Sequence, residues 1–256
     1  MKIIGIIPAR MASTRFPGKP MAEIHGIPMI GHVYLRSKMA KTLDEVYVAT
    51  CDKEIHDYIA SIGGKAVMTS EKHKRASDRT AEAMEKIENM EGYQTDIVVM
   101  IQGDEPMFNP EMIEKAIEPF SEGEEVKVVN LLGKLKTKEE FEDPNEVKVV
   151  VDKKNFALYF SREPIPSRKK GRSNVPMYKQ VCIIPFRRDF LLTYNNMEPT
   201  PLEEIESVDM LRVLEHGEQV RMVPVEYDTC SVDTKEDLEK VSKLMEKDNL
   251  IEKYRK

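Results

Sequence analysis

The sequence predicts an α/β protein built on a doubly wound, mostly parallel sheet. In the first half of the chain, short apolar runs that indicate buried strands alternate with amphipathic stretches of helical spacing. The first run, Lys2–Ala9, is apolar almost throughout, as expected of a central parallel strand covered on both faces. Polar residues follow this run and a later one directly. Because ligands of such sheets bind beyond the carboxyl ends of the strands, these polar residues are the first candidates for a functional site.

The first half of the chain supplies the strand and helix alternation that this fold requires. Strands are predicted at Lys2–Ala9, Glu45–Thr50, Lys65–Thr69 and the start of Asp96–Pro106. Helices are predicted at Met29–Ala40, Lys53–Ile62, Ser77–Met90 and Asn109–Phe120. The last of these begins with Asn109 as N-cap and Pro110 in its first turn.

The second half of the chain is less regular. Consecutive strands are predicted at Glu146–Asp152, Phe156–Arg162 and Lys179–Arg188, with the basic, proline-bearing loop Glu163–Pro176 between the last two. One amphipathic helix, Pro201–Gly217, then precedes a strand at Gln219–Tyr227 and a final helix at Thr234–Lys247. Thr234 and Asp237 have the spacing of a capping box at the start of that final helix.

Composition bounds the class of protein. The 256 residues suffice for a single domain over 1–256, and the net charge of −6 argues against a nucleic-acid-binding surface. The three cysteines are far apart and form no zinc or redox motif, which favours a reduced, cytoplasmic protein. The first apolar run is too short for a membrane span or a signal peptide, so no membrane partner is expected.

The loop after the first strand is the strongest functional signal. Within ten residues it carries Arg10, Arg15 and Lys19, with Ser13 and Thr14 between them. Such a loop can converge backbone amides and positive charges on a polyphosphate. Neither a Walker A motif nor GxGxxG is present. The alternative interpretation is a solvated basic edge.

Two aspartates form the second candidate constellation. Asp104 follows a buried strand, next to Gly103, and Asp233 follows a late strand and precedes the last helix. Carboxylates at strand ends suit Mg²⁺, which takes few protein ligands beside phosphate and water oxygens. For Asp233 the alternative interpretation is a helix N-cap.

Several motifs, in order along the chain, resemble the 3-deoxy-manno-octulosonate cytidylyltransferase (CMP-Kdo synthetase) family. The likeness runs from about residue 2 to about residue 243. The motifs are IIPARMASTRFPGKP, IQGDEPM, NEVKVVVD, ALYFSREPIP, PLEEIESVDMLRVLEHG and SVDTKEDLEKV.

This resemblance implies a fold of the nucleotide-diphospho-sugar transferase type, with a small β-rich dimerisation and acceptor subdomain at about 155–200, and a homodimer. It implies a CTP-dependent enzyme that joins CMP to a 3-deoxy-ulosonic acid, releases pyrophosphate and serves polysaccharide synthesis. It places Arg10 and Lys19 at the phosphates, Ser13 and Arg15 in supporting contacts, and Gln102 beside the nucleotide. It makes Asp104 and Asp233 the Mg²⁺ ligands, and Lys19, Arg10 and both aspartates the catalytic residues.

The chain departs from the family mainly where sugar and base contacts are expected. Arg75, Ala76 and Ser77 replace the usual Ser-Gly-Thr, although Arg79 is retained. Gln180 stands for a histidine, Phe186 for a tyrosine and Met210 for a glutamine. The candidates for the acceptor pocket are Arg162, Gln180, Glu203 and Glu206, of which Arg162 suits a carboxylate.

These departures keep alternative functions open. The acceptor can be Kdo or another acid, such as 8-amino-Kdo, a nonulosonic acid or a phosphonate, because a site that loses hydrogen-bonding groups discriminates differently. A protein of a different class, a non-catalytic CTP-binding regulator, is also consistent with the loop. Pyrophosphate release from CTP separates the enzyme from the regulator.

Overall fold

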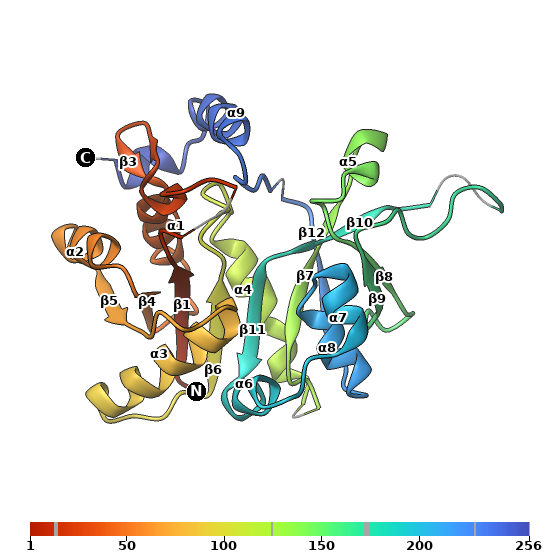
Figure 1. Cartoon of the computed structure of the whole chain (residues 1–256), viewed down its shortest axis with the longest axis horizontal. Helices are drawn as coiled ribbons and strands as arrows, with labels where there is room; N and C mark the ends of the chain where they lie inside the picture. Colours follow the sequence, from red (N-terminus) through yellow and green to blue (C-terminus); the bar gives the residue numbers. More distant parts are fainter. Residues whose placement is uncertain (13–14, 124, 172–174, 228, 256) are drawn as a thin grey trace. The chain divides into compact units, whose positions relative to one another are not determined.

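The chain forms two compact units. The computed structural model describes residues 1–12, 15–123, 125–171, 175–227 and 229–255. Met1–Glu114 and Asp228–Lys256 make up the first unit, and Lys115–Tyr227 makes up the second (Figure 1). The predicted dimerisation and acceptor subdomain, 155–200, lies within the second unit.

The first unit contains the predicted parallel sheet. Strands β6 (Ile97–Ile101), β1 (Ile3–Ala9), β4 (Glu45–Thr50) and β5 (Lys65–Met68) pair in that order and all run parallel. Nearly every residue of β1 is buried, so both faces of this strand are covered, as its apolar run predicts. The chain leaves β1 towards β4 and β5 and later returns to its other side as β6. The strand order therefore reverses between β1 and β6, where ligands of open α/β sheets bind.

Helices pack against this sheet at the positions that the periodicity predicts. α1 (Met29–Ser37), α2 (Lys53–Ser61) and α3 (Ala76–Glu91) all contact its strands. α4 (Glu111–Ile117) follows β6, and Asn109 caps it by accepting a hydrogen bond from the backbone N–H of Glu111. The remaining elements of this unit are the turn η1 (Lys19–Met21), the hairpin β2 (Glu23–Ile24) and β3 (Ile27–Pro28), α9 (Lys235–Met245) and η3 (Ile251–Lys253).

The second unit is built on a mostly antiparallel sheet. Its strand order is β12 (Arg221–Val225), β7 (Val129–Lys134), β10 (Tyr178–Val181), β8 (Lys148–Val151) and β9 (Ala157–Ser161). Only β12 and β7 among these pair in parallel. β11 (Ile183–Arg187) follows β10, so the single strand predicted at Lys179–Arg188 is interrupted at Cys182. Helical segments are η2 (Glu118–Ser121), α5 (Lys138–Glu142), α6 (Arg188–Asn195), α7 (Pro201–Glu206) and α8 (Met210–Glu215).

The long helix predicted at Pro201–Gly217 is wrong, because the segment forms α7 and α8 with a break between them. Ser207 adopts a left-handed conformation with φ of 51°, which ends α7. Serine, valine and aspartate at 207–209 are weak helix formers, so the local sequence does little to oppose the break.

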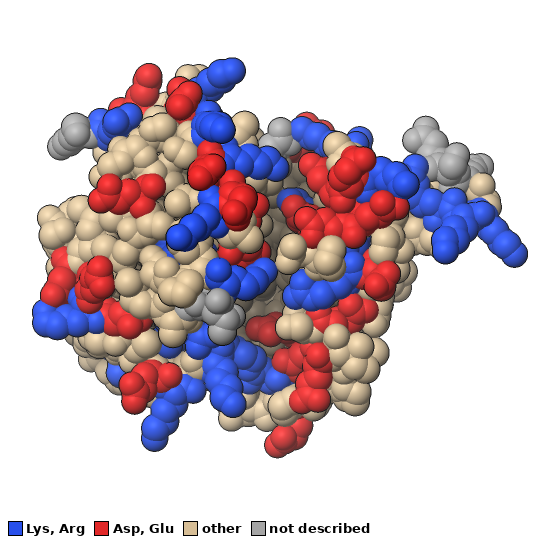
Figure 2. Space-filling model, turned by 45° about the horizontal axis from the view of Figure 1, so that its top comes forward, with Lys and Arg blue, Asp and Glu red and all other residues tan. Residues whose placement is uncertain are grey.

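Figure 2 shows how the surface charge is distributed. Acidic and basic side chains are interspersed over the face drawn, so the net charge of −6 is not gathered there into one acidic field. No helix among the described residues has both the length and the apolar character needed to cross a bilayer.

His32 on α1 is a buried titratable group that supports the first unit. Its Nε2–H donates to the carbonyl of Ile24 over 2.8 Å, and its Nδ1 accepts from the hydroxyl of Tyr254 over 2.9 Å. The ring is fully buried, and this burial lowers the pKa of His32 from 6.5 to about 4. The folded protein therefore holds His32 neutral at pH values where the unfolded chain protonates it.

Acidification should destabilise the protein through His32. Between pH 6.5 and about 4 the unfolded state binds the extra proton, so stability falls as pH falls. The slope approaches about 1.4 kcal/mol per pH unit for one proton. Urea unfolding at pH 7, 6 and 5 measures it. His32→Gln should flatten this profile, whereas the surface variant His56→Gln should keep it. An unchanged slope in His32→Gln would contradict the assignment.

Candidate active site

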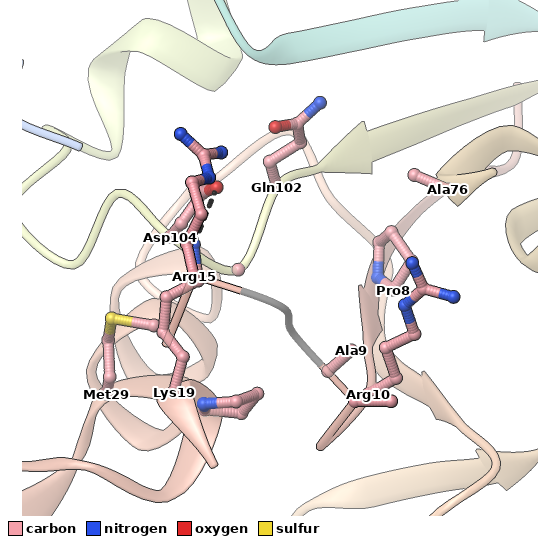
Figure 3. A pocket seen from close by; sticks show the side chains of 12 residues that line it. Pro8, Ala9, Arg10, Arg15, Lys19, Met29, Ala76, Gln102 and Asp104 are labelled. Carbon is pink, nitrogen blue, oxygen red and sulfur yellow. Dashed lines mark hydrogen bonds and ion pairs between the residues drawn. The ribbon is translucent and has the colours of Figure 1, made fainter. Parts of the chain in front are cut away.

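A cavity opens at the carboxyl end of the sheet in the first unit, at the point where the strand order reverses. Its volume is about 380 Å³, and it is lined by residues that follow β1, residues that follow β6 and the start of α3. Figure 3 shows Arg10 and Arg15 on opposite sides of it, with Gln102 and Asp104 entering from the end of β6. The polar lining residues include Arg10, Arg15, Lys19, Gln102 and Asp104.

Lys19 occupies the centre of the polar contacts at this cavity. Its Nζ lies 3.3 Å from Asp104 Oδ2 and 3.3 Å from Asp233 Oδ1. The same Nζ donates to the carbonyl oxygen of Val232 over 2.8 Å. The Lys19 side chain is only 15% exposed, so the alternative of a solvated basic edge is wrong for this residue. Two carboxylates from distant parts of the sequence therefore meet around one ammonium group.

Arg15 adds a second positive charge to the cluster. Its Nη2 lies 3.0 Å from Asp233 Oδ1. The Arg15 side chain is 58% exposed, so it approaches Asp233 from the solvent side. Ser13 and Thr14, which belong to the same predicted loop, lie outside the described residues.

The backbone of the loop explains how Lys19 reaches this position. Gly18 has a φ of 74°, a left-handed conformation that glycine adopts without strain, and its N–H donates to the carbonyl of Met11. Pro20 then occupies the first turn of η1, where its missing N–H is not needed. This turn buries Pro20 and places Lys19 against the end of β6.

The N-terminus of α9 holds Asp233 in place without using its carboxylate. Thr234 is the N-cap and forms the predicted capping box with Asp237. Asp237 also accepts a hydrogen bond from the backbone N–H of Asp233 over 3.1 Å. The capping interpretation of Asp233 is therefore wrong, and its carboxylate is turned to Lys19 and Arg15 instead.

A second, smaller cavity of about 190 Å³ shares Pro8, Ala9, Arg10 and Ala76 with the first. Four further residues line it: His73, Lys74, Arg75 and Arg79. Arg79 is 3% exposed and donates to the hydroxyl of Thr69, while Ser77 is 1% exposed on the same helix. Lys74 and Arg75 were not predicted as site residues, although the basic run KHKR was a visible signal.

The carboxylate of Glu82 anchors the rim of this second cavity. His73 contacts the carboxylate of Glu82, which also accepts from Lys86 and from the backbone N–H of Ser70. Burial raises the pKa of Glu82, but the hydrogen bonds from Lys86, Ser70 and His73 outweigh it and lower the pKa to about 2. Glu82 is therefore ionised throughout the physiological range.

The predicted acceptor residues all lie in the second unit. Glu206 accepts from the hydroxyl of Ser161 and the backbone N–H of Arg162, each over 2.8 Å. The guanidinium of Arg162 donates to the carbonyls of Glu206, Ser207 and Pro144. Gln180 lies in β10 opposite Leu132. These contacts bring Arg162 and Glu206 together, and their roles in acceptor binding stay predictions.

Glu203 takes part in a buried ion pair. Its two carboxylate oxygens each accept from the guanidinium of Arg212 over 2.6 Å. Arg212 is 2% exposed, and Glu203 also forms the capping box of α7 with Thr200. A bidentate pair of this kind fixes α7 against α8, so this geometry supports a structural role for Glu203.

The donor set at Lys19 fits a hard divalent cation. Asp104 and Asp233 supply carboxylate oxygens, and Val232 supplies a carbonyl oxygen, all within 3.3 Å of one point. Among the described residues, no group of three or more histidine, cysteine, aspartate or glutamate side chains gathers to hold a metal. Two carboxylates are the number that suits Mg²⁺ bound together with substrate phosphates.

Fold and site together define a nucleotidyltransferase: a doubly wound sheet with a basic loop and paired carboxylates at its switch point. The profile of the cytidylyltransferase family matches residues 4–220, and the chain belongs to that family. A 3-deoxy-manno-octulosonate cytidylyltransferase from Fusobacterium nucleatum is 43% identical over 98% of this chain and 99% of its own length. The enzyme of the same name from Thermodesulfovibrio yellowstonii is 44% identical over 96% of this chain and 98% of its own.

A solved structure agrees with this assignment. CMP:2-keto-3-deoxy-manno-octonic acid synthetase, determined in complex with CTP, is 38% identical to this chain. The two structures align with a TM-score of 0.88 over 96% of this chain and 99% of the other. The predicted family and fold class are confirmed.

Glu203→Gln should lower stability rather than change substrate binding alone. The substitution leaves the Arg212 charge buried without its partner, which costs about 3–5 kcal/mol. Thermal or urea unfolding measures the loss. Glu204→Gln, at the exposed neighbouring position on α7, is the matched control and should be close to neutral. If Glu203→Gln is as stable as Glu204→Gln but has a raised KM for the sugar acid, the result would favour the predicted role of Glu203 in acceptor binding instead.

Proposed function

We propose that the protein transfers CMP from CTP to the anomeric hydroxyl of 3-deoxy-manno-octulosonate and releases pyrophosphate. The observation that carries the proposal is the convergence of Asp104 and Asp233 on Lys19, at a cavity that Arg10 and Arg15 also line or border. The relatives that share nearly the whole length of the chain are named for this reaction. A relative solved with CTP supports the choice of nucleotide.

The two cavities support a placement for the nucleotide. The triphosphate fits the larger cavity, where Arg10, Arg15 and Lys19 offer positive charge. The smaller cavity continues from it at Arg10 and Ala76, so the ribose and base would extend there, towards Ser77 and Arg79. Gln102 lines the first cavity and would contact the nucleotide there.

Asp104 and Asp233 would hold Mg²⁺, which supplies neutralising charge on the phosphate oxygens and acidifies the attacking hydroxyl. Lys19 and Arg10 would stabilise the charge that develops on the transferred phosphoryl group and on the departing pyrophosphate. Arg15 lines the site from its solvent side, where it is half exposed, and would add positive charge there. In-line attack then requires the acid to approach from the side opposite the pyrophosphate.

Arg162, Gln180, Glu203 and Glu206 remain the proposed acceptor residues. The substitutions at Gln180, Phe186 and Met210 concern this same unit, so we propose testing related acids beside Kdo. We further propose a cytoplasmic homodimer. Exposed Leu158 on β9 and Ile205 on α7, at 61% and 77%, support an apolar contact surface in the second unit, which light scattering would test.

Pyrophosphate release tests the function directly. With CTP, Mg²⁺ and Kdo, a coupled phosphate assay should show release in step with formation of the CMP-sugar. Parallel reactions contain 8-amino-Kdo, a nonulosonic acid or a phosphonate. A higher kcat/KM with one of these would reassign the acceptor. No release with any acid would refute the enzyme and favour a CTP-binding regulator.

Lys19→Ala and Asp104→Asn should each lower kcat about 10²- to 10³-fold. The first removes a preorganised positive charge from the transition state, and the second removes a carboxylate that would hold Mg²⁺. Steady-state kinetics at saturating CTP and acid measure the change. Asp57→Asn is the matched control for the second variant, since Asp57 is 54% exposed on α2 and is not among the residues that line the cavity. A wild-type kcat in Lys19→Ala would contradict the role of Lys19.

A further inference from the structure

The ammonium of Lys19 lies where a cation would bind. Its three oxygen neighbours come from separate segments: Asp104 after β6, Val232 before α9, and Asp233 at the start of the α9 capping box. Two carboxylates and a backbone carbonyl are the hard oxygen ligands that divalent cations prefer. Lys19 therefore occupies a cation site with its own side chain.

The contacts to the carboxylates are loose. Charge-assisted N–H···O hydrogen bonds usually measure about 2.7–2.9 Å. Both contacts of Lys19 Nζ with carboxylates are 3.3 Å, and only the neutral carbonyl of Val232 lies closer, at 2.8 Å. One ammonium is shared between two anions, of which Asp233 also has the half-exposed Arg15 at 3.0 Å. Such an arrangement favours replacement by an ion of higher charge.

The two roles of Lys19 exclude each other. A lysine that binds phosphate oxygens, as the proposed function requires, cannot keep all three of its donors on Asp104, Val232 and Asp233. When the lysine turns to a triphosphate, the two carboxylates lose their shared positive charge. Asp233 then keeps only the half-exposed Arg15, whereas Asp104 loses its one ion pair among the described residues. Leaving a partly buried carboxylate unpaired is costly, which favours another cation in place of the ammonium.

We propose that Lys19 is an exchangeable counterion. It holds Asp104 and Asp233 together until a divalent ion and a nucleotide arrive jointly, and it then moves from the carboxylates to the phosphates. This inference rests on the proposed function for the identity of the nucleotide. Its consequence is positive coupling between the two ligands: the divalent ion binds weakly alone and tightly with nucleotide, and by linkage each ligand raises the affinity for the other.

Arg15 provides the control that distinguishes the exchange of Lys19 for a metal ion from a general loss of positive charge near Asp233. It contacts Asp233 over 3.0 Å, and its side chain is 58% exposed, against 15% for Lys19. Removing Arg15 deletes the same positive charge from the same carboxylate. It does not vacate the point shared by Asp104, Val232 and Asp233. Solvent screens its contribution more strongly.

Mn²⁺ binding, followed by electron paramagnetic resonance without nucleotide, tests the proposal. Lys19→Met should bind Mn²⁺ at least tenfold more tightly than the wild type, and Arg15→Met should stay within about threefold of the wild type, a small free-energy change. Equal affinity of the wild type and Lys19→Met would overturn the proposal. Equal tightening in both variants would also overturn it, because it would show a general charge effect.

Two further measurements keep the test decisive. Without metal, Lys19→Met should melt at a lower temperature than the wild type, because its carboxylates repel, and Mg²⁺ should restore the melting temperature of this variant alone. If the variant does not fold, the wild type suffices. The complex of wild type and a non-transferable CTP analogue must bind Mn²⁺ more tightly than either the protein or the analogue binds it alone. Absence of that tightening would refute the exchange.

The proposed function and this inference fail in different ways. Mn²⁺ binding without nucleotide does not depend on turnover, so the difference between Lys19→Met and wild type stands or falls without any acceptor. Loss of pyrophosphate release with a preserved Lys19 effect would refute the reaction and leave the exchange intact. Normal turnover, together with equal Mn²⁺ affinities of Lys19→Met and wild type, would support the reaction and refute the exchange.

Discussion

The contact of Lys19 with Asp104 and Asp233 is the interaction on which the site depends. It ties together the loop after β1, the loop after β6 and the segment before α9, which are far apart along the chain. The parallel pairing of β1 with β6 makes this possible, because it brings the carboxyl ends of both strands to one edge. The backbone N–H of Val232 donates to the carbonyl of Asp104 and fixes the third segment against the second.

A second network supports the same loop from inside the first unit. Arg36 on α1 is 1% exposed and donates to the carbonyls of Met107 and Phe108, just beyond Asp104. It also pairs with Asp248, which follows α9. The buried guanidinium therefore links the end of the chain to the segment that carries the first carboxylate. Such a charge is stable in the interior because all of these acceptors are present together.

The sequence carries strong signals for the parts of the fold that depend on local pattern. Buried strands, amphipathic helices and the Thr234 capping box follow from apolar spacing and from hydrogen bonding within a few residues. The carbonyl of Val232 gave no signal, because every residue has one and only the fold selects it. The break at Ser207 and the pairing of Glu203 with Arg212 were likewise missed, since tertiary contacts decide both. The charged residues at the cavity were predictable as a set, but their partners were not.

The charge balance of the site explains why a protein with a net charge of −6 carries a cationic loop. Asp104 and Asp233 contribute two negative charges, and Lys19 and Arg15 contribute two positive charges close to them. The cluster is therefore close to neutral in the free protein, which limits the cost of holding carboxylates in a partly buried place. A strongly positive site would retain pyrophosphate, and a strongly negative one would repel the nucleotide. A lysine that exchanges would neutralise the phosphates while the nucleotide is bound and the carboxylates when it is absent. The site would then bind the nucleotide without holding pyrophosphate too tightly for release.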